Sequence, residues 1–286
     1  MWYNLEMDNF GHALSRVNNE LLAERINREM DKDRPKYKDF EGIYSDIEMA
    51  GDQRECEEYY KKKGINPRIE KSKLRDGILV EKMFLDAELE GLFLEEEIYD
   101  ELITDDRDFL LSVLPAHEYD DLFNNVDLIC FMRNEFTGHK IVPFAVDCTS
   151  NAMKVREKME YRRTDEKVTG FTEVKYFKDT AFGTDVIPAG KLAKVPRFVV
   201  GCDAELVRDV LTSERNDWTK DELNREYEQI RYCLLKELAV QADGGELGTY
   251  FGRLLAHFEE TRGDLKEECL KDSVLNAVLK VKMGEV

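Results

Sequence analysis

The spacing of apolar residues changes several times along the chain, and these changes constrain the fold class. From Ile78 to Leu114 apolar residues recur every three or four positions, which predicts helix with Glu81 on the polar side, and Pro115 ends the region. Short β-prone runs follow, and helical spacing returns after Asp203. The predicted order is helix, strand, strand, helix, strand, strand, helices. This order is typical of an α/β protein with a mixed β-sheet flanked by helices.

The β-prone runs predict where the sheet strands lie. "VDLICFMR" and "KIVPFAVDCT" are separated by a turn that contains Gly138, so they are expected to form a hairpin. Pro143 cannot donate a hydrogen bond to a neighbouring strand, which favours an edge position or a bulge. Strands are expected at 126–133, 140–149, 171–177 and 195–202, with a helix at about 151–163 packed across them.

Residues 1–75 differ from the rest because apolar residues are sparse there. The segment "ALSRVNNELLAERINREM" predicts an amphipathic helix, and "DKDRPKYKDFEG" ends it with proline and charge. We therefore expect an N-terminal helical arm that packs on the main body or on a protein partner. Residues 76–286 are expected to form the main domain, which ends in a C-terminal helical region.

Composition narrows the classes of function. The 286 residues carry a net charge of −19, which disfavours long-range attraction to nucleic acid. No signal peptide or run of 18 apolar residues stands out, so a cytoplasmic protein without a membrane span is expected. None of the six cysteines forms a C-x-x-C pair, which predicts buried free thiols and no zinc site. His117 is expected to cap a helix or to lie at the surface.

An acid ends the most apolar strand of the chain. Asp147 closes the run "IVPFAV", and Asp127 opens the preceding strand. Side chains alternate along a strand, so Asp147 and Thr149 share one face while Cys148 points to the other. Asp147 could simply cap the next helix. Two carboxylates that meet at a sheet edge repel one another unless a cation lies between them, and oxygen ligands suit Mg²⁺ or Mn²⁺. On this second interpretation, Asp147→Asn should stabilise the metal-free protein slightly.

Basic residues follow directly. Lys154, Lys158 and Arg162 are spaced by four and form one stripe on the predicted helix. Residues 140–200 hold 12 Lys and Arg against 8 Asp and Glu, which leaves −23 for the rest of the chain. The stripe is either a solvated helix face or a local patch for nucleic acid.

Residues from about 78 to 202 resemble the PD-(D/E)xK nuclease superfamily. "NNVDLIC" resembles its first motif, with Val126 where proline is usual, and "VDCT" resembles its second, with Thr149 where lysine is usual. The longer run that ends in "VPRFVVGCD" is similar to a D-x-T variant family of that superfamily. The resemblance implies a restriction-endonuclease-like core: a helix, three or four strands of a mixed sheet and a crossing helix.

The resemblance also implies metal-assisted hydrolysis of phosphodiester bonds in DNA or RNA. Asp127 and Asp147 would hold Mg²⁺ or Mn²⁺ with the carbonyl of Cys148, and Lys158 or Lys154 would neutralise developing charge. Glu118 or Asp121 would supply a further acid.

Two other functions remain open from the sequence alone. Without a lysine at Thr149, the chain could be a catalytically inactive nuclease-like protein that binds another protein or serves as a scaffold, which suits its acidic surface. It could also be an α/β domain with different chemistry.

Overall fold

The structure is a computed structural model. It describes residues 21–22, 24–67, 77–89, 112–134, 140–164, 170–182, 185–213, 220–242 and 244–285. The first part of the predicted arm helix, residues 90–111 of the predicted long helix, and the Gly138 turn lie outside the described residues.

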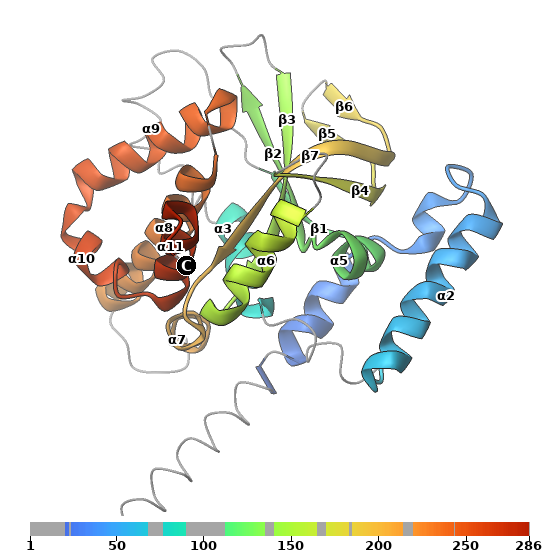
Figure 1. Ribbon diagram of the computed structural model, residues 1–286, viewed down its shortest axis with the longest axis horizontal. Coiled ribbons are helices and arrows are strands. Elements are labelled where there is room, and N and C mark those ends of the chain that lie inside the picture. The colour runs from blue at the N-terminus through green and yellow to red at the C-terminus, as the bar shows by residue number, and fades with distance from the viewer. Residues whose placement is uncertain are drawn as a thin grey trace, which may run out of the picture.

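A five-stranded mixed sheet lies at the centre of the molecule (Figure 1). Its order is β1-β2-β3-β7-β4. All neighbours are antiparallel except β3 and β7, which run parallel. The strands are β1 (Ser112–Pro115), β2 (Leu128–Asn134), β3 (Lys140–Thr149), β4 (Phe171–Phe177) and β7 (Gly190–Gly201). The predicted α/β class and mixed sheet are thus confirmed.

The predicted hairpin is β2 with β3. Phe131 lies opposite Pro143, and the pairing of β3 with β7 begins only at Ala145. Pro143 therefore lies where β3 has a single partner strand, which agrees with the expected edge position.

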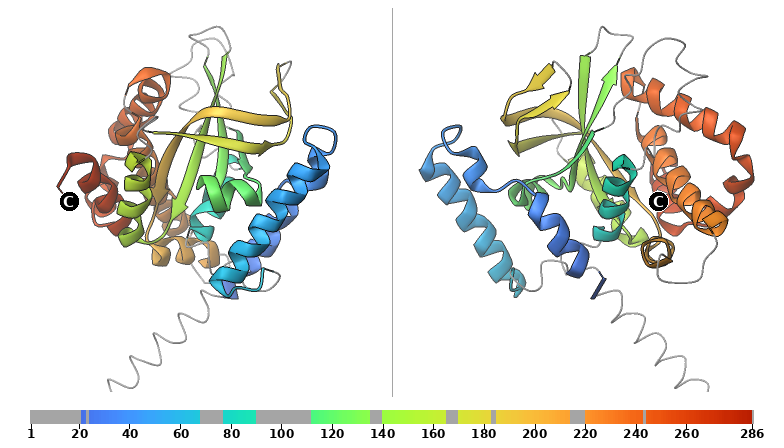
Figure 2. Two further views of the ribbon diagram at one scale, coloured as in Figure 1. Left: turned by 45° about the vertical axis from the view of Figure 1, so that its right-hand side comes forward. Right: turned by 180° about the vertical axis from the view of Figure 1, so that it is seen from behind.

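Helices cover both faces of the sheet. In Figures 1 and 2, α6 (Ala152–Thr164) crosses one face and α3 (Ile78–Leu89) lies behind the other. The C-terminal helices gather at one side of the sheet, and α5 and α2 lie at the opposite side. The bounds of these further helices are α2 (Asp46–Lys63), α5 (Glu118–Asn124), α7 (Ala204–Ser213), α8 (Lys220–Gln241), α9 (Gly245–Thr261), α10 (Lys266–Cys269) and α11 (Ser273–Met283).

Two parts of the predicted element order were wrong. The helix expected up to Leu114 gives way to an edge strand, β1, in which Val113 lies opposite Cys130 of β2. A run of four apolar residues is too short to show a helical or a strand period, so pairing with a neighbouring strand determines its conformation. A small separate sheet of β5 (Thr180–Phe182) and β6 (Asp185–Ile187) was not predicted either.

The two sheet faces belong to different core clusters. Even-numbered residues such as Leu128, Val146 and Val200 pack with the α3, α7 and α8 side. Odd-numbered residues such as Ile129 and Ala145 pack with β4, and Val199 packs with α6 and α11. Because Asp127, Asp147 and Arg197 have odd numbers, strand alternation sets all three on this second face. The alternation thus positions the candidate site.

The long strand β7 is held at its C-terminal half by α8. The Gln241 side-chain amide donates to the carbonyl of Val199 at 2.6 Å and accepts from its N–H at 3.0 Å. The Glu237 carboxyl accepts from the N–H of Gly201 at 2.7 Å. These side chains bond the backbone of β7 beyond its pairing with β4, which ends at Pro196.

The predicted arm packs on the main body through aromatic side chains and through Leu22, Ile26 and Met30, which are buried in the main hydrophobic cluster. Residues 24–33 are helical, and a 3₁₀ turn at Tyr37–Phe40 precedes α2. Phe40 is fully buried against Tyr176 of β4, and the ring of His117 lies 4.5 Å from that of Tyr176. The proposed boundary near residue 75 stays a prediction.

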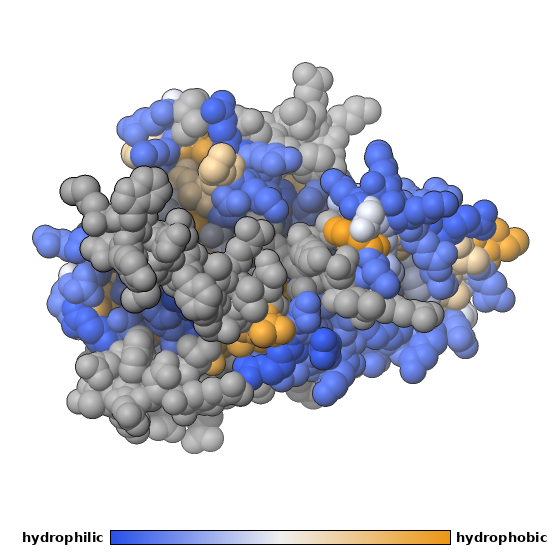
Figure 3. All heavy atoms as spheres, turned by 90° about the horizontal axis from the view of Figure 1, so that it is seen from below, coloured by the Kyte–Doolittle hydropathy of each residue, from blue (hydrophilic) through white to orange (hydrophobic). Residues whose placement is uncertain are grey.

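On the face that Figure 3 shows, the described surface is mainly polar. Figure 3 shows one face on which hydrophilic side chains dominate and apolar ones form small separate patches. In the described stretches, no helix is both long enough and apolar enough to cross a membrane. All six cysteines are buried free thiols, as predicted.

Candidate active site at the ends of β2 and β3

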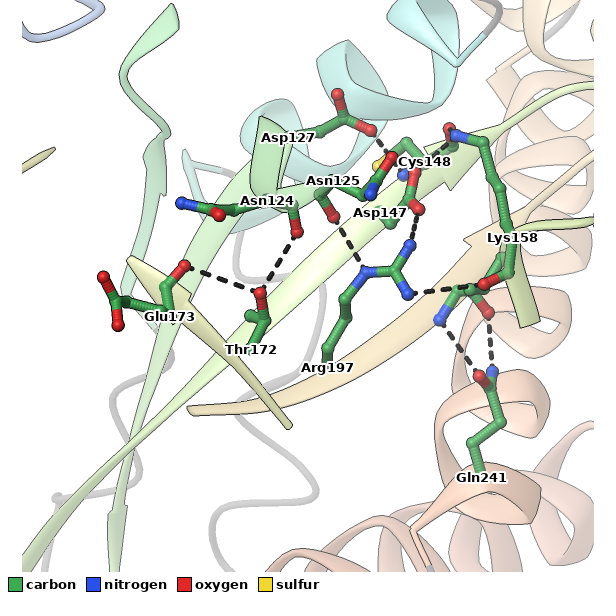
Figure 4. Close-up of polar contacts among 11 residues, drawn as sticks. Asn124, Asn125, Asp127, Asp147, Cys148, Lys158, Thr172, Glu173, Arg197 and Gln241 are labelled. Carbon is green, nitrogen blue, oxygen red and sulfur yellow. Dashed lines mark hydrogen bonds and ion pairs between the residues drawn. The ribbon is translucent and has the colours of Figure 1, made fainter. Parts of the chain in front are cut away.

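Asp147 lies near the C-terminal end of β3 and is 2% exposed. One carboxylate oxygen accepts a hydrogen bond from Lys158 of α6 and the other accepts from Arg197 of β7 (Figure 4). Both cations belong to elements that neighbour β3. The acid at the end of the apolar strand is therefore the centre of an ion-pair network.

Arg197 fixes this network to the backbone. Its side chain is 4% exposed, its Nε donates to the carbonyl of Asn125 at 2.9 Å, and a terminal nitrogen lies 3.4 Å from the carbonyl of Lys158. A guanidinium carries five N–H groups in a rigid plane, so one side chain bridges several acceptors. Arg197 thus joins the loop before β2, the end of β3 and α6.

Lys158 reaches the site from the second turn of α6. Its ammonium contacts Asp147 and also donates to the carbonyl oxygen of Cys148 at 2.7 Å. These are two of the oxygen atoms expected to hold a metal ion. Lys154 lies one turn earlier on α6, and the side chain of Arg162 lies outside the described residues.

Asp127 directly precedes β2 and comes together with Asp121 of α5. Asp127 accepts from the N–H of Cys148 at 2.7 Å, and its carboxyl group is hydrogen-bonded to that of Asp121. Burial raises the pKa of Asp127 well above its usual value, and Asp121 and Asp147 raise it further. Burial also raises the pKa of Asp121. Two such acids share a proton more readily than they both ionise.

A third cation enters from the N-terminal region. Arg34 donates to Glu81 of α3 at 2.9 Å and to the carbonyl of Ala116 at 2.7 Å, and lies 3.5 Å from Asp121. Glu81 is fully buried, so its expected place on the polar side of a helix was wrong. Glu81 can be buried because Arg34 neutralises its negative charge.

Two predicted participants have other partners in the structure. Glu118 accepts a hydrogen bond from the hydroxyl of Tyr60 at 2.5 Å. Thr149 accepts from the N–H of Asn151 at 3.2 Å and so shapes the turn from β3 into α6. His117 caps α5, as one alternative predicted, but it is buried.

Sequence reasoning missed three side chains of this network: Arg197, Arg34 and Glu81. A signal existed for Arg197, because a charge inside the apolar run "VPRFVVG" needs a buried partner. Glu81 stands between Val80 and Met83, which is a weaker signal of the same kind. Arg34 lies in a charged, proline-containing segment with no such contrast, and only the fold brings it to Glu81.

The site therefore combines three aspartates, one backbone carbonyl and three cationic side chains. The ligand set offered by Asp147, Cys148 carbonyl and Asp127 consists only of oxygen, which suits a hard divalent cation. The four acidic groups of the network, Asp147, Asp127, Asp121 and Glu81, lie beside the cations Lys158, Arg197 and Arg34. The arrangement can hold a cation and neutralise an anion next to it.

The described residues hold one tighter group of metal-ligand type, and it contains none of these aspartates. It consists of Cys202, Cys233 and Asp272, whose ligand atoms all lie within 4.8 Å of one another. The expectation of no zinc site rested on spacing along the chain, which cannot show ligands that distant segments bring together.

Comparison with family models, with curated proteins and with solved structures found no match to this chain. Function is therefore argued from the side chains that the site brings together.

Proposed function

We propose that the chain is a metal-dependent nuclease that hydrolyses phosphodiester bonds of DNA or RNA. The observation that carries this proposal is the position of the Lys158 ammonium, which contacts both Asp147 and the carbonyl oxygen of Cys148. A cationic group is thus already held by two of the oxygens that the resemblance assigns to Mg²⁺ or Mn²⁺.

The residues present fit such an ion in their donor chemistry. Asp147, Asp127 and the Cys148 carbonyl are oxygen donors from adjacent chain segments, and Asp121 adds a fourth. Two changes are needed before they act as ligands. Lys158 must withdraw from Asp147, and Asp127, whose pKa is raised by burial, must be ionised.

Each side chain then has a separate task. Arg197 keeps Asp147 oriented, because it bonds one oxygen and leaves the other for a cation. Lys158, whose side chain is partly exposed, can turn toward a phosphate and neutralise the charge that develops there. A bound divalent cation would supply polarisation of the phosphate and a lower pKa of the attacking water. Lys154 and Arg162 would contact the nucleic acid backbone.

The element order supports the same proposal. Helix α3, the antiparallel strands β1 to β3 and the crossing helix α6 come in the order that a restriction-endonuclease-like core would need, with α5 between β1 and β2 and with β4 to β6 before the parallel strand β7. Asp127 and Asp147 lie at adjacent ends of β2 and β3, as the resemblance to the nuclease motifs would require.

A second candidate function is a catalytically inactive protein-binding or scaffold module. It is favoured by the two cations on Asp147, which compensate its charge without a metal ion. Thr149, in place of the motif lysine, serves the backbone turn instead. A partner would then bind through the N-terminal region. Both candidates assume a cytoplasmic protein.

The test is a cleavage assay on single- and double-stranded DNA and RNA with Mg²⁺ or Mn²⁺. We expect Asp147→Asn and Asp127→Asn to lower the rate at least about 100-fold, by analogy with the loss of other electrostatic groups. Asp264→Asn is the matched control, because Asp264 is an exposed acid paired with Arg225 at the surface.

Lys158→Met separates the two candidates. Removal of the competing ammonium should tighten Mn²⁺ binding in a calorimetric titration while cleavage slows. If neither the natural chain nor Lys158→Met binds Mn²⁺ and no substrate is cut, the scaffold function is the better account.

A further inference from the structure

A group of thiols and one carboxylate lies where β7 meets the C-terminal helices. Sγ of Cys202, Sγ of Cys233 and a carboxylate oxygen of Asp272 lie within 4.8 Å of one another, and all three residues are buried. A further thiol, Cys269, is hydrogen-bonded to Cys233 and is fully buried as well. Two sulfur atoms and one carboxylate oxygen thus lie together in the core, and the Cys269 thiol lies against one of the two sulfur atoms.

We propose that Cys202, Cys233 and Asp272 bind a structural zinc ion, with Cys269 as the fourth ligand. The proposal is independent of the proposed nuclease function, because it uses none of the residues around Asp147.

The ligands come from separate segments that the ion would join. Cys202 follows β7, Cys233 lies in α8, Cys269 ends α10, and Asp272 precedes α11. Cys269 and Asp272 are separated by two residues, which is the short spacing common in structural zinc sites. A closed site of this kind adds directly to the free energy of folding.

The distances are close to those that zinc requires. Zn–S bonds of about 2.3 Å and Zn–O bonds of about 2.0 Å place tetrahedral ligand atoms about 3.5 to 3.8 Å apart. The present limit of 4.8 Å is longer by about one ångström.

The charges around the group also favour a cation. Burial raises the pKa of Asp272, and Asp203 raises it further. Burial also raises the pKa of Glu237 well above its usual value, and Asp272 adds to this effect. Within the described part of the chain, Oε1 of the fully buried Glu237 has no hydrogen-bond partner. Asp272 also caps α11 by accepting from Val274 and Leu275. The cap explains the carboxylate but not the three thiols beside it.

The types of ligand atom in this group determine which metal ion it would bind. Thiolates exclude Mg²⁺ and Ca²⁺, and a carboxylate among sulfur ligands suits Zn²⁺ better than Cu⁺. Each ligand thiol loses its proton to solvent as an S–H bond is replaced by a Zn–S bond. The hydrogen bond from Cys202 to Asp272, now 3.2 Å long, is given up in the same step.

The experiment measures zinc in the full-length protein by inductively coupled plasma mass spectrometry. We expect about one zinc ion per chain, and a thiolate-to-metal charge-transfer band with tetrahedral d–d bands after replacement by Co²⁺. Cys202→Ser and Cys233→Ser should lower zinc retention at least about tenfold, and Cys269→Ser should lower it as well. Cys130→Ser is the matched control, because Cys130 is an equally buried thiol on β2 outside the group.

The Co²⁺ spectrum of the unmodified protein decides the outcome even if a serine variant fails to fold. Absence of zinc together with absence of the charge-transfer band would overturn the proposal, and so would a Cys202–Cys233 disulfide in protein purified without reductant. Equal zinc loss in Cys130→Ser would overturn it too. Asp147→Asn should keep its zinc whether or not it cleaves nucleic acid, which separates this site from the proposed nuclease.

Discussion

Asp147 shows how a single residue resolves a conflict between its position and its charge. A carboxylate at the end of an apolar strand is costly unless it is paired. Here α6 supplies Lys158 and β7 supplies Arg197, and both bond the carboxylate. The sequence indicated the need for a cation, but it could not show that the chain itself provides two.

This pairing reverses the effect expected for Asp147→Asn in the metal-free protein. Mutual repulsion between acids predicted a slight gain in stability. Because Arg197 would lose the partner for its buried charge, we now expect a loss on the order of 3 kcal/mol in the free energy of unfolding. Urea denaturation without metal measures it, with Asp264→Asn as an exposed control that should change stability by less than about 0.5 kcal/mol. A stabilised Asp147→Asn would contradict the ion-pair account.

His117 offers a second residue-scale test because it is buried among aromatic rings. Burial lowers its pKa from 6.5 to about 4, so the folded state keeps it neutral. Between these values the unfolded chain binds the extra proton, and stability therefore falls as pH falls from about 6.5 toward 4.

We expect the natural protein to lose about 2 kcal/mol more than His117→Asn between pH 7 and pH 5. Asparagine also caps helices well, so the variant keeps the cap and removes the titration. Asp120, whose pKa burial raises to about 6, opposes this trend, but it is present in both proteins. Urea denaturation at each pH measures the two slopes. Parallel slopes would show that His117 is not the titrating group.

At the scale of elements, the long strands were the most predictable. The strands expected at 140–149 and 171–177 match β3 and β4, because long β-prone runs with clear ends favour a single conformation. The edge strand β1 and the small β5–β6 sheet were missed, since three or four residues carry no period. The site was predicted in the same uneven way: Asp127, Asp147 and Lys158 follow from local pattern, but Arg34 reaches Glu81 across 47 positions.

Gly77 tests the packing of α3 against the end of β3. A Cβ at Gly77 would lie 2.2 Å from the carbonyl oxygen of Cys148, which is the oxygen that Lys158 contacts. Gly77→Ala should therefore separate these elements and cost about 3 kcal/mol. The control is Gly51→Ala in α2, where a Cβ meets nothing within 4 Å and helix propensity predicts a gain of about 0.5 to 1 kcal/mol. Thermal unfolding of both variants gives the comparison, and equal stabilities would refute the close approach.

Arg34 tests how the N-terminal region is joined to α3. Its side chain is 3% exposed, so Arg34→Met leaves Glu81 buried without its partner and should cost about 3 to 5 kcal/mol. Arg28→Met, whose side chain is 76% exposed, should change stability by less than about 0.5 kcal/mol.

A double-mutant cycle with Glu81→Gln assigns the cause of the Arg34 effect. The double variant should recover most of the loss, because the uncompensated charge is removed. Additive losses in urea denaturation would show that packing of Arg34, and not its charge, is what matters.

At the scale of the whole molecule, the N-terminal region and the sheet share buried contacts. Sparse apolar residues predicted a separate arm, since hydrophobic pattern is the only signal of a core that sequence carries. The contacts found are partly apolar, because Leu22, Ile26 and Met30 are buried in the main hydrophobic cluster, and the others are polar and aromatic. Tyr176 of β4 donates to Asp52 at 2.5 Å, and Arg34 bonds the carbonyl of Ala116. Polar and aromatic contacts form between residues that share no recognisable sequence pattern, so composition alone could not reveal them.

Deletion of residues 1–75 tests whether the main domain folds without the N-terminal region. Independence of the arm predicted that the sheet domain would remain folded. Removal of Arg34 and Phe40 would instead leave Glu81 charged in the core and Tyr176 exposed, so we expect loss of cooperative thermal unfolding by circular dichroism. The same deletion with Glu81→Gln isolates the charge: partial recovery of a cooperative transition would assign the failure to the missing Arg34. An unaltered transition in the simple deletion would show that residues 76–286 fold alone, because the buried ion pair would then contribute nothing that the sheet needs.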